Sequence, residues 1–482
     1  MPINQWFHRL FPLMFIAVVS AISCSAQDRA LNTVEVELQR LIQDPALKHG
    51  QLAFVAVNLD NGTVIAEHNN YRSMIPASIQ KVITTATSLD RFGPAHSFKT
   101  SIGYTGSIAE GTLQGDLIIL GVGDPTLGSR FFRGDEDGNA IKTAISNAGI
   151  TAVNGKVIVD ASAYVKHTTP DAMSWEDMGN YFGATPSAFM WKDNMMEVAL
   201  RSGQVGTDVV LADPWPTDGP FSLEIDIQAA EGTKDDAWFF SAPGSDMIYG
   251  KGSIPAHRER FVVKISNPDP MHTFCQWMID DLDLGTPEIQ INHERIPIPN
   301  IQVLVELESP HLSDLIRITN QESVNLFAEA LNLANDPAEV YRSVDGGLEA
   351  SKAFLKKHKI KAAGVRLLDG SGISPMNRMT AQTMVEVLSA MYRTDSYEFF
   401  RASLAVGGES GTMKWYFKSG AAKGNIRGKS GTMTGVRNYA GYVKNQHGEQ
   451  IAFCLMMNDY DEDRRSEVMN KFETLIEAVI QD

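Results

Sequence analysis

The spacing of apolar residues along this chain changes twice, at about residues 100 and 300. The first part predicts a helix at 31–42, a hairpin of strands 52–57 and 63–67, and a buried helix that begins near Ser78. The middle part is a series of short strands with glycine-rich turns, and the last part returns to helical patterns. The return to helical patterns after a different middle part indicates that residues from about 100 to 300 are inserted material.

The length of the chain supports this division. A chain of 482 residues exceeds the roughly 250 to 300 residues around which a single core forms. We therefore expect two or three domains. The elements expected in the second and last parts are strands at 117–121, 157–160, 436–443 and 450–456, and helices at 323–335, 346–357, 380–392 and 466–480.

The charge balance excludes one class of partner. The sequence has 58 acidic and 42 basic residues, which gives a formal net charge of -16. Such a chain repels phosphate backbones, and no run of lysine and arginine forms a local basic patch. We therefore expect no nucleic-acid partner.

The first residues are typical of an export signal. An apolar run at 10–22 follows Arg9, and it is shorter than the about 20 residues that span a bilayer. Residues 1–26 are therefore predicted to be a signal peptide, and the remainder is predicted to work outside the cytoplasm. Two processing routes fit the segment: cleavage after Ala26, which we favour, and lipidation of Cys24, which would be the only attachment to a membrane.

The two other cysteines permit two interpretations. In an oxidising compartment Cys275 and Cys454 could form a disulfide. Two isolated cysteines are equally typical of buried, small apolar side chains, and Cys454 lies inside the apolar run 451–457.

Ser78 and Lys81 form the only Ser-x-x-Lys motif of the chain. Three residues apart on a helix, a hydroxyl and an amine lie on the same face, close enough to share a proton. A lysine can accept the proton of a serine only where burial or nearby cations lower its pKa, and the apolar run that follows Lys81 suits this requirement. A surface pair is the ordinary explanation of such a spacing, so the motif needs support from elsewhere in the chain.

Ser323 and Asn325 supply a second motif, the only Ser-x-Asn of the sequence, at the start of a predicted helix. A serine at this position is also a common helix cap, which would stabilise the helix by roughly 1 kcal/mol without any role in catalysis. Taken alone, the motif is better explained as a cap.

A third motif, Lys-Ser-Gly, occurs twice, beginning at Lys418 and at Lys429. Strand patterns follow the second copy, whereas the first copy lies in a predicted loop. We therefore assign the motif to Lys429, Ser430 and Gly431. A strand with this sequence lets a peptide bind alongside it as an added strand, because glycine allows close approach and lysine attracts a carboxylate.

The three motifs in this order resemble those of penicillin-binding proteins and β-lactamases. The long segment between the first two motifs resembles one branch, the class C penicillin-binding proteins of the D-alanyl-D-alanine carboxypeptidase and endopeptidase family. Segments 123–127, 175–194 and 369–374 are similar to that family as well, and the resemblance covers nearly all of the mature chain. Two positions depart from the family pattern: Val324 replaces an acidic or amide residue, and Ser430 replaces the more common threonine.

The resemblance implies an α/β fold, a β-lactamase/transpeptidase-like domain whose antiparallel sheet is flanked by helices. Residues 27–99 and 300–482 would be the two parts of this domain, and residues 100–299 would form one or two smaller, β-rich domains. It implies that Ser78 attacks the carbonyl between two D-alanines and that Lys81 accepts the proton of Ser78. Ser323 and Lys429 would then relay a proton to the leaving amine.

The resemblance also implies how the substrate binds. Asn325 would hold the peptide amide, Ser430 would bind the terminal carboxylate, and Gly431 would permit close approach of the peptide. The backbone N–H groups of Ser78 and Thr432 would form the oxyanion hole. No metal or cofactor is expected.

The function implied is that of a serine D-Ala-D-Ala carboxypeptidase, a D,D-endopeptidase, or both, which acts on peptidoglycan stem peptides and is acylated by β-lactams. The sequence leaves the balance of the two activities, the diamino acid of the stem peptide and the oligomeric state open. The alternatives are a β-lactamase or esterase on the same fold and a non-catalytic cell-wall binding module.

Overall fold

The computed structural model describes residues 32–482, except 216–220, 243–244 and 296–299. The predicted signal peptide, with Cys24 and Ala26, lies outside the described residues. Within the described ranges, no helix is both long enough and apolar enough to cross a membrane.

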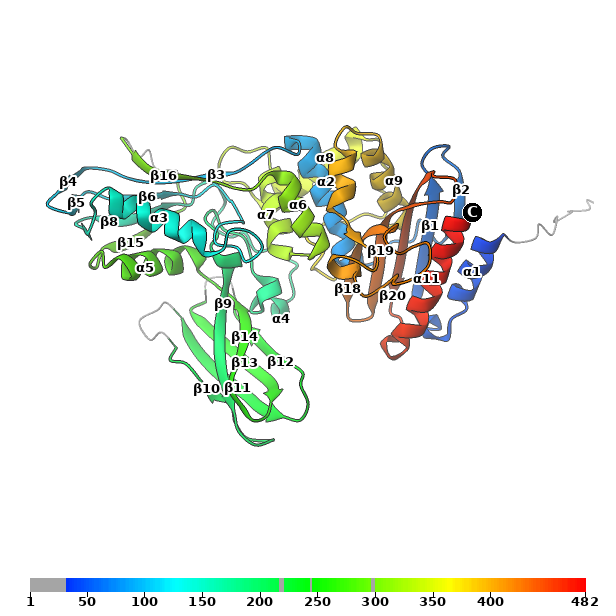
Figure 1. Ribbon diagram of the computed structural model, residues 1–482, viewed down its shortest axis with the longest axis horizontal. Coiled ribbons are helices and arrows are strands. Elements are labelled where there is room, and N and C mark those ends of the chain that lie inside the picture. Colours follow the sequence, from blue (N-terminus) through cyan, green and yellow to red (C-terminus); the bar gives the residue numbers. More distant parts are fainter. Residues whose placement is uncertain (1–31, 216–220, 243–244, 296–299) are drawn as a thin grey trace, which may run out of the picture.

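A six-stranded antiparallel sheet joins the two ends of the chain (Figure 1). The first strand of the chain pairs with the last along its whole length, from Gln51 opposite Asn458 to Asn58 opposite Ile451. The sheet order is β17-β18-β19-β20-β1-β2. Its strands are β1 (Gln51–Asn58), β2 (Val64–His68), β17 (Ala405–Val406), β18 (Arg427–Met433), β19 (Val436–Lys444) and β20 (Gln450–Asn458).

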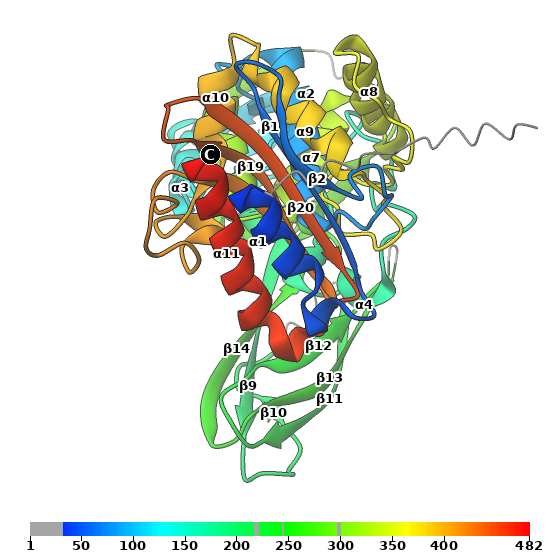
Figure 2. The ribbon, with the colours of Figure 1, turned by 90° about the vertical axis from the view of Figure 1, so that its right-hand side faces the viewer.

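Helices cover both faces of this sheet (Figure 2). Strand β20 is therefore buried along its whole length, with Phe453 and Leu455 in the core beneath one pair of helices and Cys454 and Met456 in the core on the opposite face. The pair is α1 (Thr33–Ile42) and α11 (Arg465–Gln481). The other face carries α2 (Lys81–Phe92), α6 (Leu312–Gln321), α7 (Asn325–Asn335), α8 (Val344–Lys357), α9 (Ala381–Tyr392) and α10 (Tyr397–Ser403).

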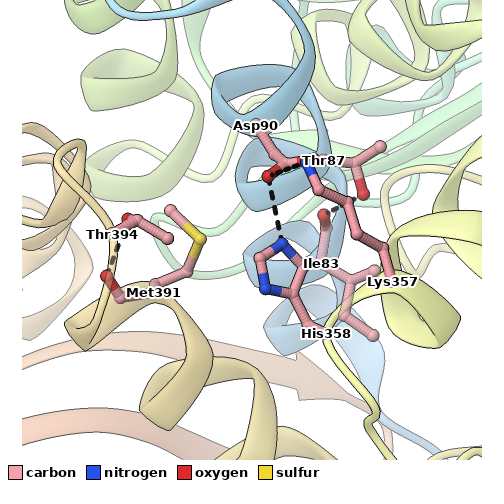
Figure 3. Close-up of polar contacts among 7 residues, drawn as sticks. All are labelled: Ile83, Thr87, Asp90, Lys357, His358, Met391 and Thr394. Atoms are coloured by element: carbon pink, nitrogen blue, oxygen red, sulfur yellow. Dashed lines mark hydrogen bonds and ion pairs between the residues drawn. The ribbon is translucent and has the colours of Figure 1, made fainter.

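Helix α2 lies among these helices and is fixed at its far end by a charged contact. The Asp90 carboxylate accepts hydrogen bonds of 2.7 and 2.8 Å from Lys357 at the end of α8, and it lies 3.0 Å from Nε2 of His358 (Figure 3). Partial burial acts to raise the pKa of Asp90, but the hydrogen bonds from Lys357 and His358 outweigh it and lower that pKa. The contact holds α2, which begins at Lys81, against α8.

The inserted region has two lobes. One is a five-stranded sheet of order β15-β8-β6-β3-β16, whose core it shares with helices α3 and α5, beside a small sheet of order β4-β5-β7. Its elements are β3 (Lys99–Tyr104), β4 (Ser107–Ala109), β5 (Thr112–Gln114), β6 (Leu117–Leu120), α3 (Asp135–Asn147), β7 (Ala152–Val153), β8 (Lys156–Asp160), α5 (Pro270–Leu282), β15 (Glu288–Asn292) and β16 (Gln302–Glu308).

The second lobe consists of two three-stranded sheets around one apolar core and projects away from the rest of the molecule (Figure 1). Helix α4 (Trp175–Met178) lies beside it. Its strands are β9 (Met195–Ser202), β10 (Val210–Leu211), β11 (Ser222–Ala230), β12 (Asp236–Phe240), β13 (Met247–Pro255) and β14 (Arg258–Ser266).

The strands by which the chain enters and leaves the insertion are neighbours. β3 pairs antiparallel with β16, with Lys99 opposite Glu308 and Tyr104 opposite Gln302. Since β16 completes the inserted sheet, we propose that the insertion extends to Glu308 and not to 299, where the sequence pattern placed its end.

Most elements predicted from the sequence are confirmed within one to three residues, and these include the hairpin β1–β2, strands β6, β8, β19 and β20, and helices α1, α7, α8, α9 and α11. The disulfide alternative is wrong, because Cys275 and Cys454 are free and are buried in two separate cores.

Candidate active site

Ser78 stands in a strained turn at the entrance to α2. It belongs to a short 3₁₀ turn, Ala77–Gln80, and Ala77 has a backbone φ of 46°, in the left-handed region that non-glycine residues rarely adopt. The Asn438 amide on β19 donates hydrogen bonds of 2.8 Å to the carbonyls of Ile75 and Pro76. The central sheet thereby fixes the turn that presents the Ser78 hydroxyl.

The Lys81 amine is fully buried and has three oxygen neighbours. Its Nζ lies 2.9 Å from Ser78 Oγ, 2.6 Å from Asn325 Oδ1 and 2.8 Å from the carbonyl oxygen of Ser371. Burial lowers the pKa of Lys81 to about 7, although the charges of Glu329 and Asp369 act in the opposite direction. A large fraction of this lysine is therefore uncharged at neutral pH.

The neighbours of Lys81 determine where its lone pair points. A neutral amine has two hydrogens, and the amide oxygen of Asn325 and the carbonyl of Ser371 can only accept hydrogen bonds. If these two oxygens take the two hydrogens, the lone pair faces the remaining neighbour, the Ser78 hydroxyl. This is the geometry of a base that is positioned to accept the serine proton.

Two buried carboxyl groups fix the backbone of residues 370–374, which contacts Lys81. Glu329 on α7 accepts hydrogen bonds from the backbone N–H groups of Gly370 and Ser371, at 2.8 to 3.1 Å. Asp369 accepts from the backbone N–H groups of Gly372 and Ser374. Burial raises the pKa of both carboxyls. Glu329 therefore positions the Ser371 carbonyl that contacts the Lys81 amine.

Ser323 and Lys429 form a second hydroxyl–amine pair. Lys429 Nζ on β18 donates a hydrogen bond of 2.8 Å to Ser323 Oγ and one of 2.7 Å to the backbone carbonyl of Ser430. Burial, together with the charges of Lys81 and Arg437, lowers the pKa of Lys429 well below its ordinary value. Both lysines of the site therefore give up a proton more readily than a lysine in water.

The alternative explanation of Ser323 as a helix cap is wrong. The cap position of α7 is occupied by Val324, which makes no side-chain cap bond. Ser323 itself has a positive φ of 61° and directs its hydroxyl to Lys429. The strained backbone of Ser323 therefore goes together with its contact to Lys429 within the site.

The two Lys-Ser-Gly copies lie in different surroundings. Lys429 is buried and contacts Ser323, whereas Lys418 is exposed and its ammonium lies 5.1 Å above the ring of Trp415. Only the copy that begins at Lys429 contributes to the cluster around Ser78.

Strand β18 presents an open edge beside Ser78. The short strand β17 pairs only with Arg427 and Gly428, so in the described structure no strand pairs with residues 429–433 on that side. Gly431 lies so close to the nucleophile turn that a Cβ at this position would be 2.7 Å from the Pro76 oxygen and 3.1 Å from the Ser78 nitrogen. The motif requires glycine here because any side chain would displace the turn.

Hydroxyl groups line the other face of β18. Ser430 Oγ donates a hydrogen bond of 2.7 Å to Thr412 Oγ1, and Thr432 Oγ1 accepts one of 2.6 Å from Arg437. The Ser430 side chain is nearly buried, whereas Thr432 is exposed. The Thr432 hydroxyl keeps its hydrogen for an anion at the end of a peptide bound along the open edge, and the Ser430 hydroxyl does so when Thr412 is the donor in their shared hydrogen bond.

Asn325 connects the site to the inserted region. While its Oδ1 accepts from Lys81, its Nδ2 donates a hydrogen bond of 2.8 Å to the backbone carbonyl of Phe182. One hydrogen of Nδ2 is left over for a further acceptor. The insertion therefore fixes the orientation of this amide.

Four residues of the site were not singled out from the sequence: Glu329, Asn438, Thr412 and Arg437. Glu329 could have been found, because it follows Asn325 by four residues and lies on the same face of α7. The others have no comparable signal, because their contacts depend on how distant strands pair.

Comparisons with known proteins agree with this fold and site. The model of the D-Ala-D-Ala carboxypeptidase 3 (S13) family matches residues 34–479. The chain is 24% identical over 478 residues to the D-alanyl-D-alanine carboxypeptidase of Actinomadura sp. (strain R39), with 94% of this chain and 85% of that protein covered. It is 25% identical over 432 residues to the D-alanyl-D-alanine carboxypeptidase DacB of Haemophilus influenzae, with 85% of each protein covered.

Solved structures share the architecture. Penicillin-binding protein 4 of Haemophilus influenzae superposes with a TM-score of 0.80 at 24% identity, and the match covers 94% of this chain and 100% of that chain. A peptidoglycan endopeptidase of Bdellovibrio bacteriovorus gives a TM-score of 0.53 at 16% identity, with coverage of 89% and 92%. The predicted α/β, transpeptidase-like fold with a large inserted region is confirmed.

The first prediction concerns the charge of Lys81. Its amine is expected to titrate near pH 7, neutral above and protonated below, because burial destabilises the ammonium. NMR of the protein with labelled lysine side chains would follow this titration, with the exposed Lys418 as the internal comparison. A midpoint for Lys81 near the ordinary lysine value of 10.5 would contradict the base assigned above.

The second prediction concerns Glu329. Because the Glu329 charge raises the pKa of Lys81, the substitution Glu329→Gln is expected to move the Lys81 titration to lower pH. The matched control is Glu349→Gln, which removes an exposed carboxylate from α8 and should leave the titration unchanged. An identical Lys81 midpoint in both folded variants would show that Glu329 exerts no field on the amine.

Proposed function

The chain belongs to the D-Ala-D-Ala carboxypeptidase 3 (S13) family, and we propose that Ser78 is the nucleophile with which it hydrolyses the D-Ala-D-Ala bond of peptidoglycan stem peptides. One observation carries the assignment: the buried amine of Lys81 lies 2.9 Å from the Ser78 hydroxyl, and its pKa is lowered to about 7. A serine hydroxyl becomes an effective nucleophile when a base of this kind removes its proton.

Acylation is the first step. The neutral Lys81 amine accepts the proton of Ser78 as Oγ bonds to the carbonyl carbon of the penultimate D-alanine. The backbone N–H groups of Ser78 and Thr432 would stabilise the developing oxyanion, and a donor of this type typically contributes about 3 to 4 kcal/mol. The close approach of Gly431 to the Ser78 nitrogen supports this placement, because it brings the end of β18 next to the nucleophile turn.

Collapse of the tetrahedral intermediate requires a proton on the leaving amine. Ser323 is the proposed donor, with Lys429 as the group that restores its proton, because the Lys429 amine lies 2.8 Å from Ser323 Oγ. Hydrolysis of the acyl-enzyme then reverses the roles, with water in place of the leaving amine.

The substrate is proposed to bind along the open edge of β18, residues 429–433, as an added strand. The free hydrogen of Asn325 Nδ2 would hold the peptide amide, and the hydroxyls of Ser430 and Thr432 would bind the carboxylate of the leaving group. A terminal D-alanine carries such a carboxylate, and so does a cross-linked diamino acid whose linking nitrogen lies on an amino-acid centre. The same site would therefore serve a carboxypeptidase and an endopeptidase.

We also propose an extracytoplasmic location, because the apolar run at 10–22 is typical of an export signal and peptidoglycan lies outside the cytoplasm. Cleavage after Ala26 is the favoured processing route, with lipid on Cys24 as the alternative. β-Lactams are proposed as covalent inhibitors, because their ring carbonyl presents the same target to Ser78.

The third prediction is tested with a fluorescent penicillin followed by denaturing electrophoresis. The mature protein is expected to form a covalent band that is lost in Ser78→Ala. Lys429→Ala should reduce labelling at least about 100-fold, since it removes the partner of Ser323, whereas Lys418→Ala should label like the wild type. Equal labelling of the two lysine variants would overturn the choice between the two Lys-Ser-Gly copies.

The fourth prediction concerns the products. Digestion of purified peptidoglycan should release D-alanine from pentapeptide stems, convert cross-linked dimers to monomers, or do both, and mass spectrometry distinguishes the two reactions. Ser78→Ala should do neither. Rapid turnover of penicillin without attack on peptidoglycan would favour the β-lactamase alternative, and binding of peptidoglycan without any covalent labelling would favour a binding module.

A further inference from the structure

Arg437 is a buried arginine directly behind the open edge of β18. It lies on β19 opposite Thr432, and only 6% of its surface is exposed. Its Nη1 donates a hydrogen bond of 2.6 Å to Thr432 Oγ1, and its Nε donates one of 2.8 Å to the Tyr439 hydroxyl. The guanidinium carbon lies 5.0 and 5.4 Å from the ring centres of Tyr416 and Tyr439.

This guanidinium has no carboxylate partner within the described part of the chain. No aspartate or glutamate of that part forms an ion pair with Arg437, although the sequence contains 58 acidic residues and 42 basic ones. A charge that is removed from water is costly unless an opposite charge or a full set of hydrogen bonds compensates it. Its two protein acceptors are both neutral hydroxyls, and the Nη2 nitrogen donates to no protein group that the structure describes.

A purely structural role explains part of this arrangement. The two tyrosine rings stabilise the cation by cation–π contact. Such contacts do not explain why the guanidinium reaches Thr432 at the substrate edge, where its Nη2 is not among the buried atoms that lack a partner and is open to a ligand. An anion bound at this edge would accept a hydrogen bond from Thr432 and one from the Nη2 nitrogen of Arg437.

The other cation of the site is poorly suited to an anion. The sequence pattern suggested that the lysine of Lys-Ser-Gly attracts a carboxylate, but Lys429 Nζ is occupied by Ser323 Oγ and the Ser430 carbonyl. Burial also lowers the pKa of Lys429, and the Arg437 charge contributes to this shift. Arginine remains charged at all relevant pH values, so Arg437 is the permanent positive charge beside Thr432.

We propose that Arg437 is the specificity-determining charge of the site, which acts on the substrate carboxylate together with the hydroxyls of Thr432 and Ser430. This inference rests on the proposed function and deepens it. It assigns the enzyme to acyl donors whose leaving nitrogen carries a carboxylate on the adjacent carbon. That class includes a C-terminal D-alanine, the amino-acid centre of a cross-link and the free acid of a penicillin.

The experiment compares one penicillin as its free acid and as its methyl ester, which differ only in this carboxylate. Acylation rates are measured by intact-protein mass spectrometry for the wild type, Arg437→Gln, Arg437→Lys and Arg465→Gln. Arg465 is the matched control, because it also lies over the Tyr416 ring and donates to a tyrosine hydroxyl, that of Tyr416, but donates no described hydrogen bond to β18. Thermal melting establishes that each variant is folded.

Arg437→Gln is expected to slow acylation by the acid about 10- to 100-fold and to leave the ester within about threefold of the wild-type rate, because a charge-assisted contact is lost only for the acid. Arg437→Lys should lower the acid-to-ester ratio about fivefold, since it keeps the charge but loses the planar fork. Arg465→Gln should keep the wild-type ratio.

Two results would overturn the inference: an unchanged acid-to-ester ratio in folded Arg437 variants, or an equal slowing of acid and ester, which is the signature of a structural role. If Arg437→Gln does not fold, the acid-to-ester ratio of acylation rates in Arg437→Lys decides alone, and an unchanged ratio overturns the inference. Absence of wild-type labelling by both compounds would overturn the proposed function and this inference with it, whereas wild-type labelling with unchanged ratios overturns this inference alone.

Discussion

The burial of one amine is the constraint on which the rest of the site depends. A lysine in water is protonated at neutral pH and cannot accept a proton from serine. Lys81 is fully buried, and the desolvation of its ammonium brings its pKa to about 7. The helices α6, α7, α8 and α9 surround α2 and bury Lys81. The packing of the domain therefore also makes this lysine a base.

Desolvation alone would leave the amine unoriented. The structure orients it with two acceptors that come from different parts of the chain, the Asn325 amide at the start of α7 and the Ser371 carbonyl of the loop before α9. Glu329 fixes that loop through three hydrogen bonds to its backbone. A buried carboxyl near a buried amine is costly unless its hydrogen bonds are satisfied, and here the backbone N–H groups satisfy them.

The sequence predicted the local elements well, and it placed Ser78 beside Lys81, because both features have local signals. Ser78 and Lys81 follow helical spacing, and the pairs of strands and helices at both ends follow apolar periodicity. Contacts across the sheet were not predictable. Arg437 faces Thr432 only because β18 and β19 pair in one register, and a shift of that register by one residue would turn the Arg437 side chain to the opposite face. The pairing of β16 with β3, from which we propose the later end of the insertion, has no local signal either.

The insertion is part of the site and not an appended module. The backbone carbonyl of Phe182 occupies one donor of Asn325, whose amide oxygen in turn contacts Lys81. Without that carbonyl, the Asn325 amide could rotate and present its nitrogen to Lys81, which would leave the amine with one acceptor fewer and its lone pair without a defined direction. A displacement of the inserted lobe would therefore reach the nucleophile through two hydrogen bonds, and this coupling gives a physical reason for a catalytic domain to tolerate a long interruption of its chain.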